Sequence, residues 1–253
     1  MNTPYLAIIG GSGLYAFEGL ENTRRHAIDT PYGAPSCEIL TGDFSCHRLA
    51  FLARHGEQHS VLPHRVNYRA NLWALHSLGV RRVVAVNAVG GIRADMGSGT
   101  MVVPDQLIDY SYGRYSSFYD TDNAKVKHVE FAEPYTQSLR QDLLAAMKLA
   151  ELPVIAGGCY GVTQGPRFET RAEIARMRRD GCDLVGMTSM PEAVLACELG
   201  MDYACLALVS NFAAGCGDGQ AFTVEEILKN VSTITVNVPP VVLALLKLQG
   251  AAA

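Results

Sequence analysis

The sequence lacks the segments that would direct it to a membrane or across one. Its N-terminus has no basic stretch followed by an apolar run and a cleavage site, and no run of roughly 18 or more apolar residues occurs in the chain. We therefore expect neither a signal peptide nor a transmembrane helix, and no membrane partner.

Paired cysteine motifs are also absent. The seven cysteines are odd in number, scattered, and form no C-x-x-C pair. Several lie in apolar runs such as YACLALV (203–209), where a buried free thiol is more common than a disulfide. This pattern favours the reducing environment of the cytoplasm.

Charge is scarce as well, at 18% of residues, and 21 Lys and Arg against 25 Asp and Glu give a net charge of −4. This balance gives no reason to expect nucleic acid as a partner, so an anionic ligand must be held by local donors. With 49% apolar residues, 253 residues are enough for one large hydrophobic core. No repeat or linker divides the chain, and we expect a single domain over residues 1–253.

What the sequence does contain is an alternation of short apolar runs and helical patterns. It predicts an α/β fold: a three-layer sandwich with a mixed, mainly parallel twisted sheet flanked by helices. The expected strands are 6–11, 83–91, 154–163, 184–187 and 203–211, and the expected helices are 67–78, 134–150, 170–181 and 191–199. A last helix begins at Thr223, and Pro239-Pro240 must kink or break it. Residues 110–133 are aperiodic and are interpreted as a long functional loop.

Ligands of open α/β sheets bind beyond the carboxyl ends of strands, and five regions have the expected character. They are GGSG (10–13), ARHGEQH (53–59), NAVGG (87–91), GPRFET (165–170) with GMTSMPE (186–192), and SNFAAG (210–215). The glycines of GGSG can bring backbone amides to an oxyanion, with the Ser12 hydroxyl as a further donor. Arg54 offers a planar fork that matches phosphate geometry.

Two other interpretations of these motifs are disfavoured. His55 and His59 are four residues apart, but Gly56 and Pro63 oppose a helix and no H-E-x-x-H pattern results, so we expect no metal. GGSGLY lacks the third glycine of G-x-G-x-x-G, which argues against dinucleotide binding.

Taken together and in order, the segments resemble the trimeric nucleoside phosphorylase family, which includes purine nucleoside phosphorylases and methylthioadenosine phosphorylases. The resemblance covers almost the whole chain through IIGGSGLY, ARHGEQH, HRVNYRANLWAL, NAVGGIR, SFYD, AEPY, GPRFETRAE, GMTSMPE and SNFAAG. It implies a homotrimer that acts on a nucleoside, with inorganic phosphate as co-substrate and no metal or organic cofactor.

The resemblance also implies site residues. Phosphate would be bound by Ser12, Arg54, His55, Asn87, the Ala88 backbone N–H and Thr188. The nucleoside would be contacted by Phe168, Glu169, Met187, Asn211, Val224 and His128, the last reaching across from a neighbouring subunit. Arg54, His55 and hydroxyl donors would clamp the attacking phosphate, while Asn211 stabilises the leaving base.

The base site departs from the methylthioadenosine phosphorylases, which carry serine at the Glu169 position and aspartates near Asn211. A carboxylate accepts from the N–H at nitrogen 1 of a 6-oxopurine, whereas adenine has a lone pair there. Asn211 can donate to the 6-oxo group and accept from protonated nitrogen 7. These residues predict a 6-oxopurine base.

The sugar site differs from the inosine-cleaving enzymes, which have a histidine for the 5′-hydroxyl where this chain has Val224. Valine suits an apolar 5′-substituent, although a plain core position in the last helix is the alternative. An oxopurine site joined to an apolar 5′ site predicts phosphorolysis of 5′-methylthioinosine to hypoxanthine and 5-methylthioribose 1-phosphate. A general inosine/guanosine phosphorylase, a methylthioadenosine phosphorylase and a non-catalytic nucleotide-binding protein are the other hypotheses.

Overall fold

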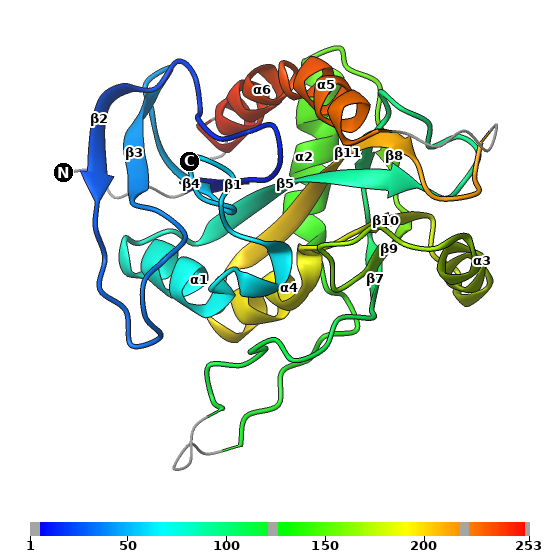
Figure 1. Cartoon of the computed structure of the whole chain (residues 1–253). Helices are drawn as coiled ribbons and strands as arrows, with labels where there is room; N and C mark the ends of the chain where they lie inside the picture. Colours follow the sequence, from blue (N-terminus) through cyan, green and yellow to red (C-terminus); the bar gives the residue numbers. More distant parts are fainter. Residues whose placement is uncertain (1–5, 121–125, 218–222, 251–253) are drawn as a thin grey trace.

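The computed structural model describes residues 6–120, 126–217 and 223–250, and Figure 1 shows one sheet crossing it with helices on both sides. The strands are β1 (Leu6–Gly10), β2 (Glu21–His26), β3 (Ile39–Phe44), β4 (His47–Ala53), β5 (Arg82–Gly91), β6 (Met101–Val103), β7 (Gln106–Asp109), β8 (Ile155–Ala156), β9 (Cys159–Val162), β10 (Leu184–Gly186) and β11 (Asp202–Phe212). The helices are α1 (Tyr68–Ser77), α2 (Gln137–Leu149), α3 (Arg171–Asp180), α4 (Ser189–Glu198), α5 (Val224–Thr235) and α6 (Val238–Gly250), with a short 3-10 turn at Pro63–Arg65.

All of these strands join one sheet in which parallel pairings predominate. Its main path runs β2-β3-β4-β1-β5-β10-β9-β7, and β11 pairs with both β5 and β6. Six of the strand pairings are parallel and four are antiparallel. The predicted single-domain α/β sandwich with a mixed, mainly parallel sheet is confirmed.

The sheet is buried on both faces, as β1 illustrates. Leu6 and Ile8 pack into one hydrophobic cluster, and the alternate residues Ala7 and Ile9 pack into another. Successive side chains of a strand point to opposite faces, so a strand covered on both sides reads as a continuous apolar run. This explains why LAIIG carries no polar alternation.

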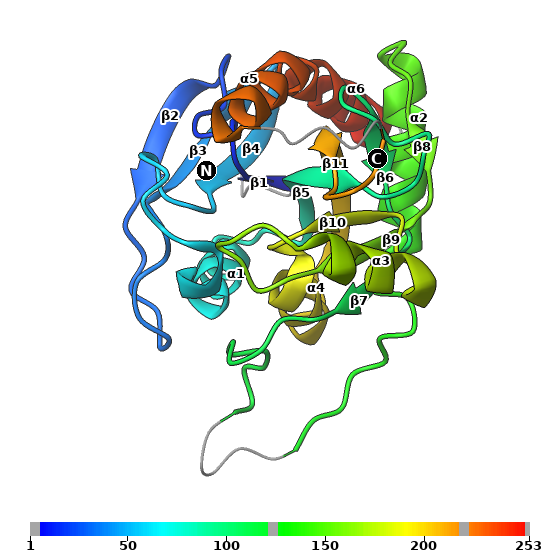
Figure 2. The ribbon, with the colours of Figure 1, turned by 45° about the vertical axis from the view of Figure 1, so that its right-hand side comes forward.

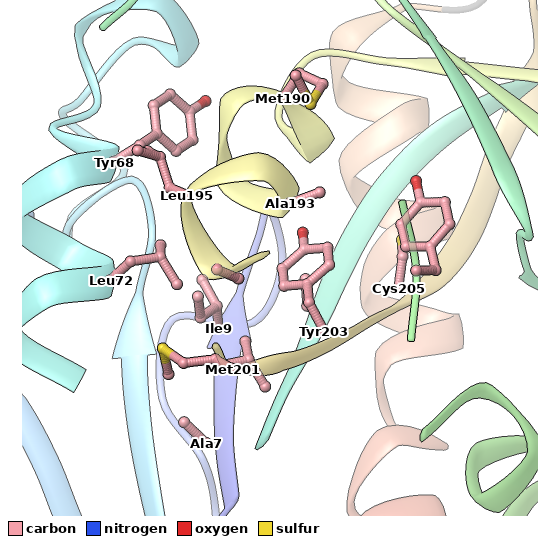
Figure 3. Packing of buried hydrophobic residues seen from close by; sticks show 14 of the residues in the cluster. Ala7, Ile9, Tyr68, Leu72, Met190, Ala193, Leu195, Met201, Tyr203 and Cys205 are labelled. Carbon is pink, nitrogen blue, oxygen red and sulfur yellow. The ribbon is translucent and has the colours of Figure 1, made fainter. Parts of the chain in front are cut away.

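Helices complete the outer layers. In Figure 2, α1 and α4 lie on one side of the sheet, and α2, α5 and α6 lie on the other. Figure 3 shows Tyr68 and Leu72 of α1 with Ala193 and Leu195 of α4 in the first cluster, next to Tyr203 of β11. The third cluster is smaller and joins α3 to the ends of β5 and β10.

Most predicted elements are present, with instructive differences. The run 154–163 forms two strands, β8 and β9, because Gly157 and Gly158 have φ of +91° and +132° and interrupt the pairing. The expected break near Pro239-Pro240 is confirmed, and α6 begins as a new helix at Val238. The helices expected at Thr170 and Thr223 both begin with a capping box. The sequence patterns did not predict β2, β3, β4, β6 or β7.

One segment meets the length and composition of a membrane helix. The segment Val224–Leu248, which spans α5 and α6, has a mean hydropathy of 1.6. Half of its most apolar 18-residue stretch is buried inside the structure. Val238, Val241 and Leu245 of α6 pack into the second cluster against the sheet. Burial of this kind accounts for the hydropathy, because core helices share the composition of membrane helices.

Candidate active site

β5 pairs with β1 along its first part and with β10 at its end, and the candidate site lies at the stretch between the two. The pairing of β1 with β5 ends where Gly10 lies opposite Val86. The pairing of β10 with β5 begins at Gly90, and β1 and β10 both adjoin β5 in the main strand order. Between these points, Asn87–Val89 pair only with β11 among the described strands. The sheet edge at Asn87 and Ala88 is therefore open, as a backbone N–H that binds an anion requires.

The turn after β1 lies against the open edge of β5. A Cβ built on Gly11 would lie 2.5 Å from the Val86 carbonyl oxygen and 3.0 Å from Nη1 of Arg54. Only glycine allows this approach. Ser12 follows Gly11 directly and is partly exposed, so its hydroxyl is accessible to a ligand.

Arg54, at the end of β4, is fully buried and bonded to a carboxylate. Its Nε and Nη2 donate to the two oxygens of Glu192 at 2.7 and 2.8 Å, and Nη1 donates to the Val86 carbonyl at 3.3 Å. Burial opposes the charge of Arg54, but the attraction and hydrogen bonds of Glu192 raise its pKa. The Nε–Nη2 edge of the planar fork is thus occupied by Glu192, and Nη1 donates to a backbone carbonyl.

His55 is buried beside Arg54 in a defined tautomer. Its Nδ1 lies 2.8 Å from the carbonyl oxygen of Val61, so Nδ1 carries hydrogen and donates. Burial, together with the positive charge of Arg54, lowers the pKa of His55 to about 4. Nε2 is consequently an acceptor at pH 7. The ring can therefore accept a hydrogen bond from a ligand O–H such as that of HPO₄²⁻.

Asn87 and Thr188 are both neighbours of the buried phenol of Tyr160. Nδ2 of Asn87 donates to the Tyr160 hydroxyl at 3.5 Å. Burial raises the pKa of Tyr160, and its neighbours Asn87 and Thr188 partly counter this increase. Oδ1 of Asn87 is buried without a partner among the described residues. An unpaired buried acceptor is costly, so a ligand hydroxyl is expected to complete it.

Glu169 lies in the segment between β9 and α3. Its Oε1 accepts from the Thr163 hydroxyl at 2.6 Å. Burial raises the pKa of Glu169, and the Thr163 hydrogen bond partly counters this increase. One carboxylate oxygen is thus fixed and the other is available to a base. Phe168 is 54% exposed and presents an open ring beside it.

Asn211 lies at an irregularity of β11, where the register with β5 shifts between Val209 and Asn211. The Ser210 hydroxyl donates to Oδ1 of Asn211 at 2.7 Å, and Nδ2 donates to the Phe212 carbonyl at 2.7 Å. These contacts fix the amide while one Nδ2 hydrogen stays available. Asn230 of α5 donates to the Ser210 carbonyl at 2.8 Å and ties that helix to the same strand end.

Met187 follows β10 and packs on the turn before Phe168. A Cβ on Gly165, whose φ is +62°, would lie 2.5 Å from Sδ of Met187. The segments that carry Met187 and Glu169 therefore contact each other directly. Glycine at this point brings the predicted ribose and base contacts together.

Val224 and His128 are placed differently from the rest. Val224 is the first residue of α5 and is 59% exposed, so the alternative of a plain core position is wrong. His128 is exposed, and no hydrogen bond or ring contact described within this chain connects it to the other predicted site residues. Within one chain, the turn after β1 lies against Arg54 and the turn before Phe168 lies against Met187, whereas no described contact joins His128 to either pair.

Two further features of the described chain lie outside this cluster. His55 and His59 have ring centroids 5.0 Å apart, but residues 6–120, 126–217 and 223–250 contain no group of three metal-ligating side chains. A cavity of 570 Å³ lies behind Phe212, and its lining includes Arg93, Arg178 and Cys182 but no predicted site residue.

The family model described as "Phosphorylase superfamily" matches residues 5–247. The chain belongs to the phosphorylase superfamily. It is 54% identical over 241 residues to a probable S-methyl-5′-thioinosine phosphorylase from Xanthomonas campestris pv. campestris, covering 95% of this chain and 96% of that protein. It is 44% identical over 250 residues to a 6-oxopurine nucleoside phosphorylase from Pyrococcus furiosus, covering 97% and 93% of the two chains.

Solved structures of this superfamily share the fold. A methylthioadenosine phosphorylase sourced from an antarctic soil metagenomic library superposes with a TM-score of 0.92 at 38% identity, covering 99% of this chain and 88% of that one. The predicted enzyme class, a pentosyltransferase of the purine nucleoside phosphorylase type, is confirmed.

The sequence analysis did not identify the residues that form hydrogen bonds with the predicted site residues Arg54 and Glu169. Glu192 and Thr163 were not singled out, although both lie within or next to the quoted motifs. Glu192 stands in a helix of otherwise mostly apolar residues, SMPEAVLACE. A carboxylate in such a setting is a signal, because buried charges require a partner.

Proposed function

We propose that this phosphorylase cleaves 5′-methylthioinosine with inorganic phosphate, giving hypoxanthine and 5-methylthioribose 1-phosphate. The observation that carries the proposal is the fixed carboxylate of Glu169, whose Oε1 is held by Thr163 at 2.6 Å. Its other oxygen is an acceptor suited to the N–H at nitrogen 1 of a 6-oxopurine. The relative named probable S-methyl-5′-thioinosine phosphorylase supports the same substrate.

The apolar 5′ substituent is assigned to Val224. This side chain is exposed on the first turn of α5, and that helix is tied to the Asn211 strand end through Asn230. Valine has no hydrogen-bonding group, so a 5′-hydroxyl facing it would lose water without gaining a partner. A methylthio group forms no strong hydrogen bonds with water and therefore loses none beside Val224.

Phosphate acts as the nucleophile in the proposed reaction. Its oxygen bonds the anomeric carbon as the bond to nitrogen 9 breaks, and the bonding pair leaves with the purine. Arg54 and the donors of Ser12 and Ala88 hold the phosphate, and Nε2 of His55 accepts a hydrogen bond from the phosphate O–H. The purine leaves with the bonding pair and takes up one proton at nitrogen 7, where Asn211 accepts from the N–H and donates to the 6-oxo group. The sugar phosphate monoester gives up the one proton that HPO₄²⁻ brought, so no proton is gained or lost overall. No metal or organic cofactor is part of this proposal.

The proposal also includes one catalytic domain over residues 1–253, a homotrimer in which His128 contributes to a neighbouring site, and location in the cytoplasm. The family resemblance supports the trimer, and seven free thiols suit a reducing compartment.

A substrate panel tests the function. Methylthioinosine, methylthioadenosine, inosine, guanosine and adenosine are each incubated with and without phosphate, and base release and sugar phosphate are measured. We expect phosphate-dependent release that is fastest with methylthioinosine. Glu169→Ser should lose this preference, whereas Glu151→Ser, which alters an exposed carboxylate after α2, is the matched control. Base release independent of phosphate, or a preference for methylthioadenosine, contradicts the proposal.

A further inference from the structure

Arg114 lies in the loop 110–133, which the sequence analysis interprets as functional. All five of its N–H groups donate hydrogen bonds. Nη1 donates to the carbonyls of Met187 and Met190 at 2.8 and 2.5 Å, and Nη2 donates to the carbonyls of Thr163 and Gln164 at 3.0 and 2.8 Å. Nε donates to Oε1 of Gln164 at 3.2 Å. Arginine is the only side chain that offers five donors in one plane.

The four carbonyls share one property: each lies just beyond the regular pairing of its element. Thr163 and Gln164 follow the end of β9, and Met187 follows the end of β10. Met190 has φ of −113° and ψ of 139° inside α4, so it departs from the helical ladder. Backbone acceptors at such positions need a donor from elsewhere, and Arg114 supplies it to all four.

These carbonyls belong to the two segments that carry the predicted substrate contacts. Gln164 precedes the turn to Phe168 and Glu169, and Met187 precedes Thr188. The two segments are also linked by Thr163, whose amide and hydroxyl donate to the Gly186 carbonyl at 2.8 and 3.3 Å, and by the packing of Met187 on Gly165. Arg114 therefore bridges the base half and the phosphate half of the site at one point.

We propose that Arg114 is a positioning residue, which sets the distance between the base contacts at 168–169 and the ribose and phosphate contacts at 187–188. This inference rests on the proposed function, because it uses the substrate contacts assigned there. Arg114 itself contacts backbone and not substrate. A displacement of about 1 Å in such a site can lower turnover by about 10²-fold.

The chain offers a matched control in Arg69 of α1. Its guanidinium lies 4.0 Å from the ring centre of Tyr115 and donates to the Ser117 carbonyl at 3.4 Å. Arg69 therefore holds the same loop but touches neither substrate segment. Arg69→Met loosens the loop alone, whereas Arg114→Met loosens the loop and releases the carbonyls.

Kinetics of the full-length enzyme, with KM measured separately for phosphate and nucleoside, test the role. Arg114→Met and Arg114→Lys should both lower kcat/KM by about 10²-fold and raise both KM values, because lysine keeps the charge but cannot span two segments. Arg69→Met should stay near the parent. Parent-like kinetics in Arg114→Lys overturn the proposal, as does an equal loss in Arg69→Met.

Amide hydrogen exchange tests the same role without substrate. Exchange should quicken in 164–169 and 187–189 in the Arg114 variants, and not in Arg69→Met; unchanged exchange in both segments overturns the proposal. If the parent releases no base from any nucleoside, the proposed function fails, and the exchange result still decides whether Arg114 holds the two segments. Should Arg114→Met not fold, Arg114→Lys serves both measurements.

Discussion

Glu192 holds the guanidinium of Arg54 through hydrogen bonds of 2.7 and 2.8 Å, and both side chains are 0% exposed. The Tyr203 hydroxyl donates to the same carboxylate at 2.9 Å. A buried ion pair of this kind is weak support for stability, since apolar replacement of both partners is often neutral. Its retention beside the predicted phosphate site points to a role in orienting the arginine.

This relationship predicts that stability and activity separate in a double variant. Glu192→Leu leaves a buried guanidinium unpaired and should cost about 3–5 kcal/mol in the free energy of unfolding. Arg54→Met combined with Glu192→Leu should recover most of that loss and still fail to use phosphate. Urea unfolding and initial rates against phosphate concentration measure the two effects.

Tyr203→Phe is the control, because it removes one hydrogen bond to Glu192 and leaves the ion pair intact. A loss of about 1 kcal/mol with little change in the KM for phosphate is expected. Should the double variant bind phosphate as the parent does, Arg54 is not a phosphate ligand.

His55 predicts a dependence of stability on pH. Its folded pKa of about 4 lies below the ordinary 6.5, so the folded state binds fewer protons than the unfolded state between these values. The contribution is fully present above pH 6.5 and is lost as pH falls toward 4. The loss amounts to roughly 3 kcal/mol, because each pH unit corresponds to about 1.4 kcal/mol.

His55→Asn should flatten this part of the profile, since asparagine does not titrate in this range. The measurement is the free energy of unfolding of both proteins at several pH values between 4 and 8, at one ionic strength. His76→Asn, which alters a less buried histidine on α1, should leave the slope nearly as in the parent. A parent profile that is flat over this window contradicts the buried neutral ring.

The sequence was sufficient to predict the layers of the fold but not the polar edge of the sheet. Buried strands such as LAIIG are apolar throughout, and that signal is strong because both faces are covered. β2, whose sequence is ENTRRH, is almost entirely exposed and carries no apolar pattern. β6 has only three residues, too few for a period to be recognised.

For the site, the sequence identified residues that follow strands but not the partners that orient them. Arg54 and Glu192 are 138 positions apart, and no local pattern relates them. The tautomer of His55 depends on the Val61 carbonyl, which becomes visible only once the intervening turn is built. Arg114 lies in an aperiodic loop, where neither hydrophobic period nor turn chemistry indicates what a side chain contacts.

Val224 predicts discrimination at the 5′ position. Inosine, with a hydroxyl facing valine, should have a kcat/KM about one to two orders of magnitude below that of methylthioinosine, which corresponds to roughly 1–3 kcal/mol. Val224→His should narrow this ratio by offering the hydroxyl a partner. Val236→His, which changes another exposed valine next to the same helix, is the control. Equal efficiency of the parent on both nucleosides contradicts the assignment.

Asn211 and Glu169 predict the choice of base, and the structure adds a cost to changing it. Asn211→Asp removes the donor to the 6-oxo group and supplies an acceptor for a 6-amino group. It also places a carboxylate next to the Phe212 carbonyl, which in the parent accepts a hydrogen bond from Nδ2 of Asn211 at 2.7 Å. An unpaired acceptor that is only partly buried costs at most about 1–3 kcal/mol, so the variant should be less stable and lose activity on methylthioinosine.

Activity on methylthioadenosine should rise relative to methylthioinosine in Asn211→Asp, but only in part, because Glu169 still opposes the lone pair at nitrogen 1 of adenine. Adding Glu169→Ser removes that opposition and should reverse the preference. Sites built to hydrogen-bond one analogue can reject another by up to about 10⁴–10⁵-fold, and water entering a partly exposed site should reduce the ratio here. The ratio of kcat/KM values for the two nucleosides, measured for the parent, both single variants and the double variant, decides the matter. If the double variant keeps the parent's preference, Glu169 and Asn211 do not read the base.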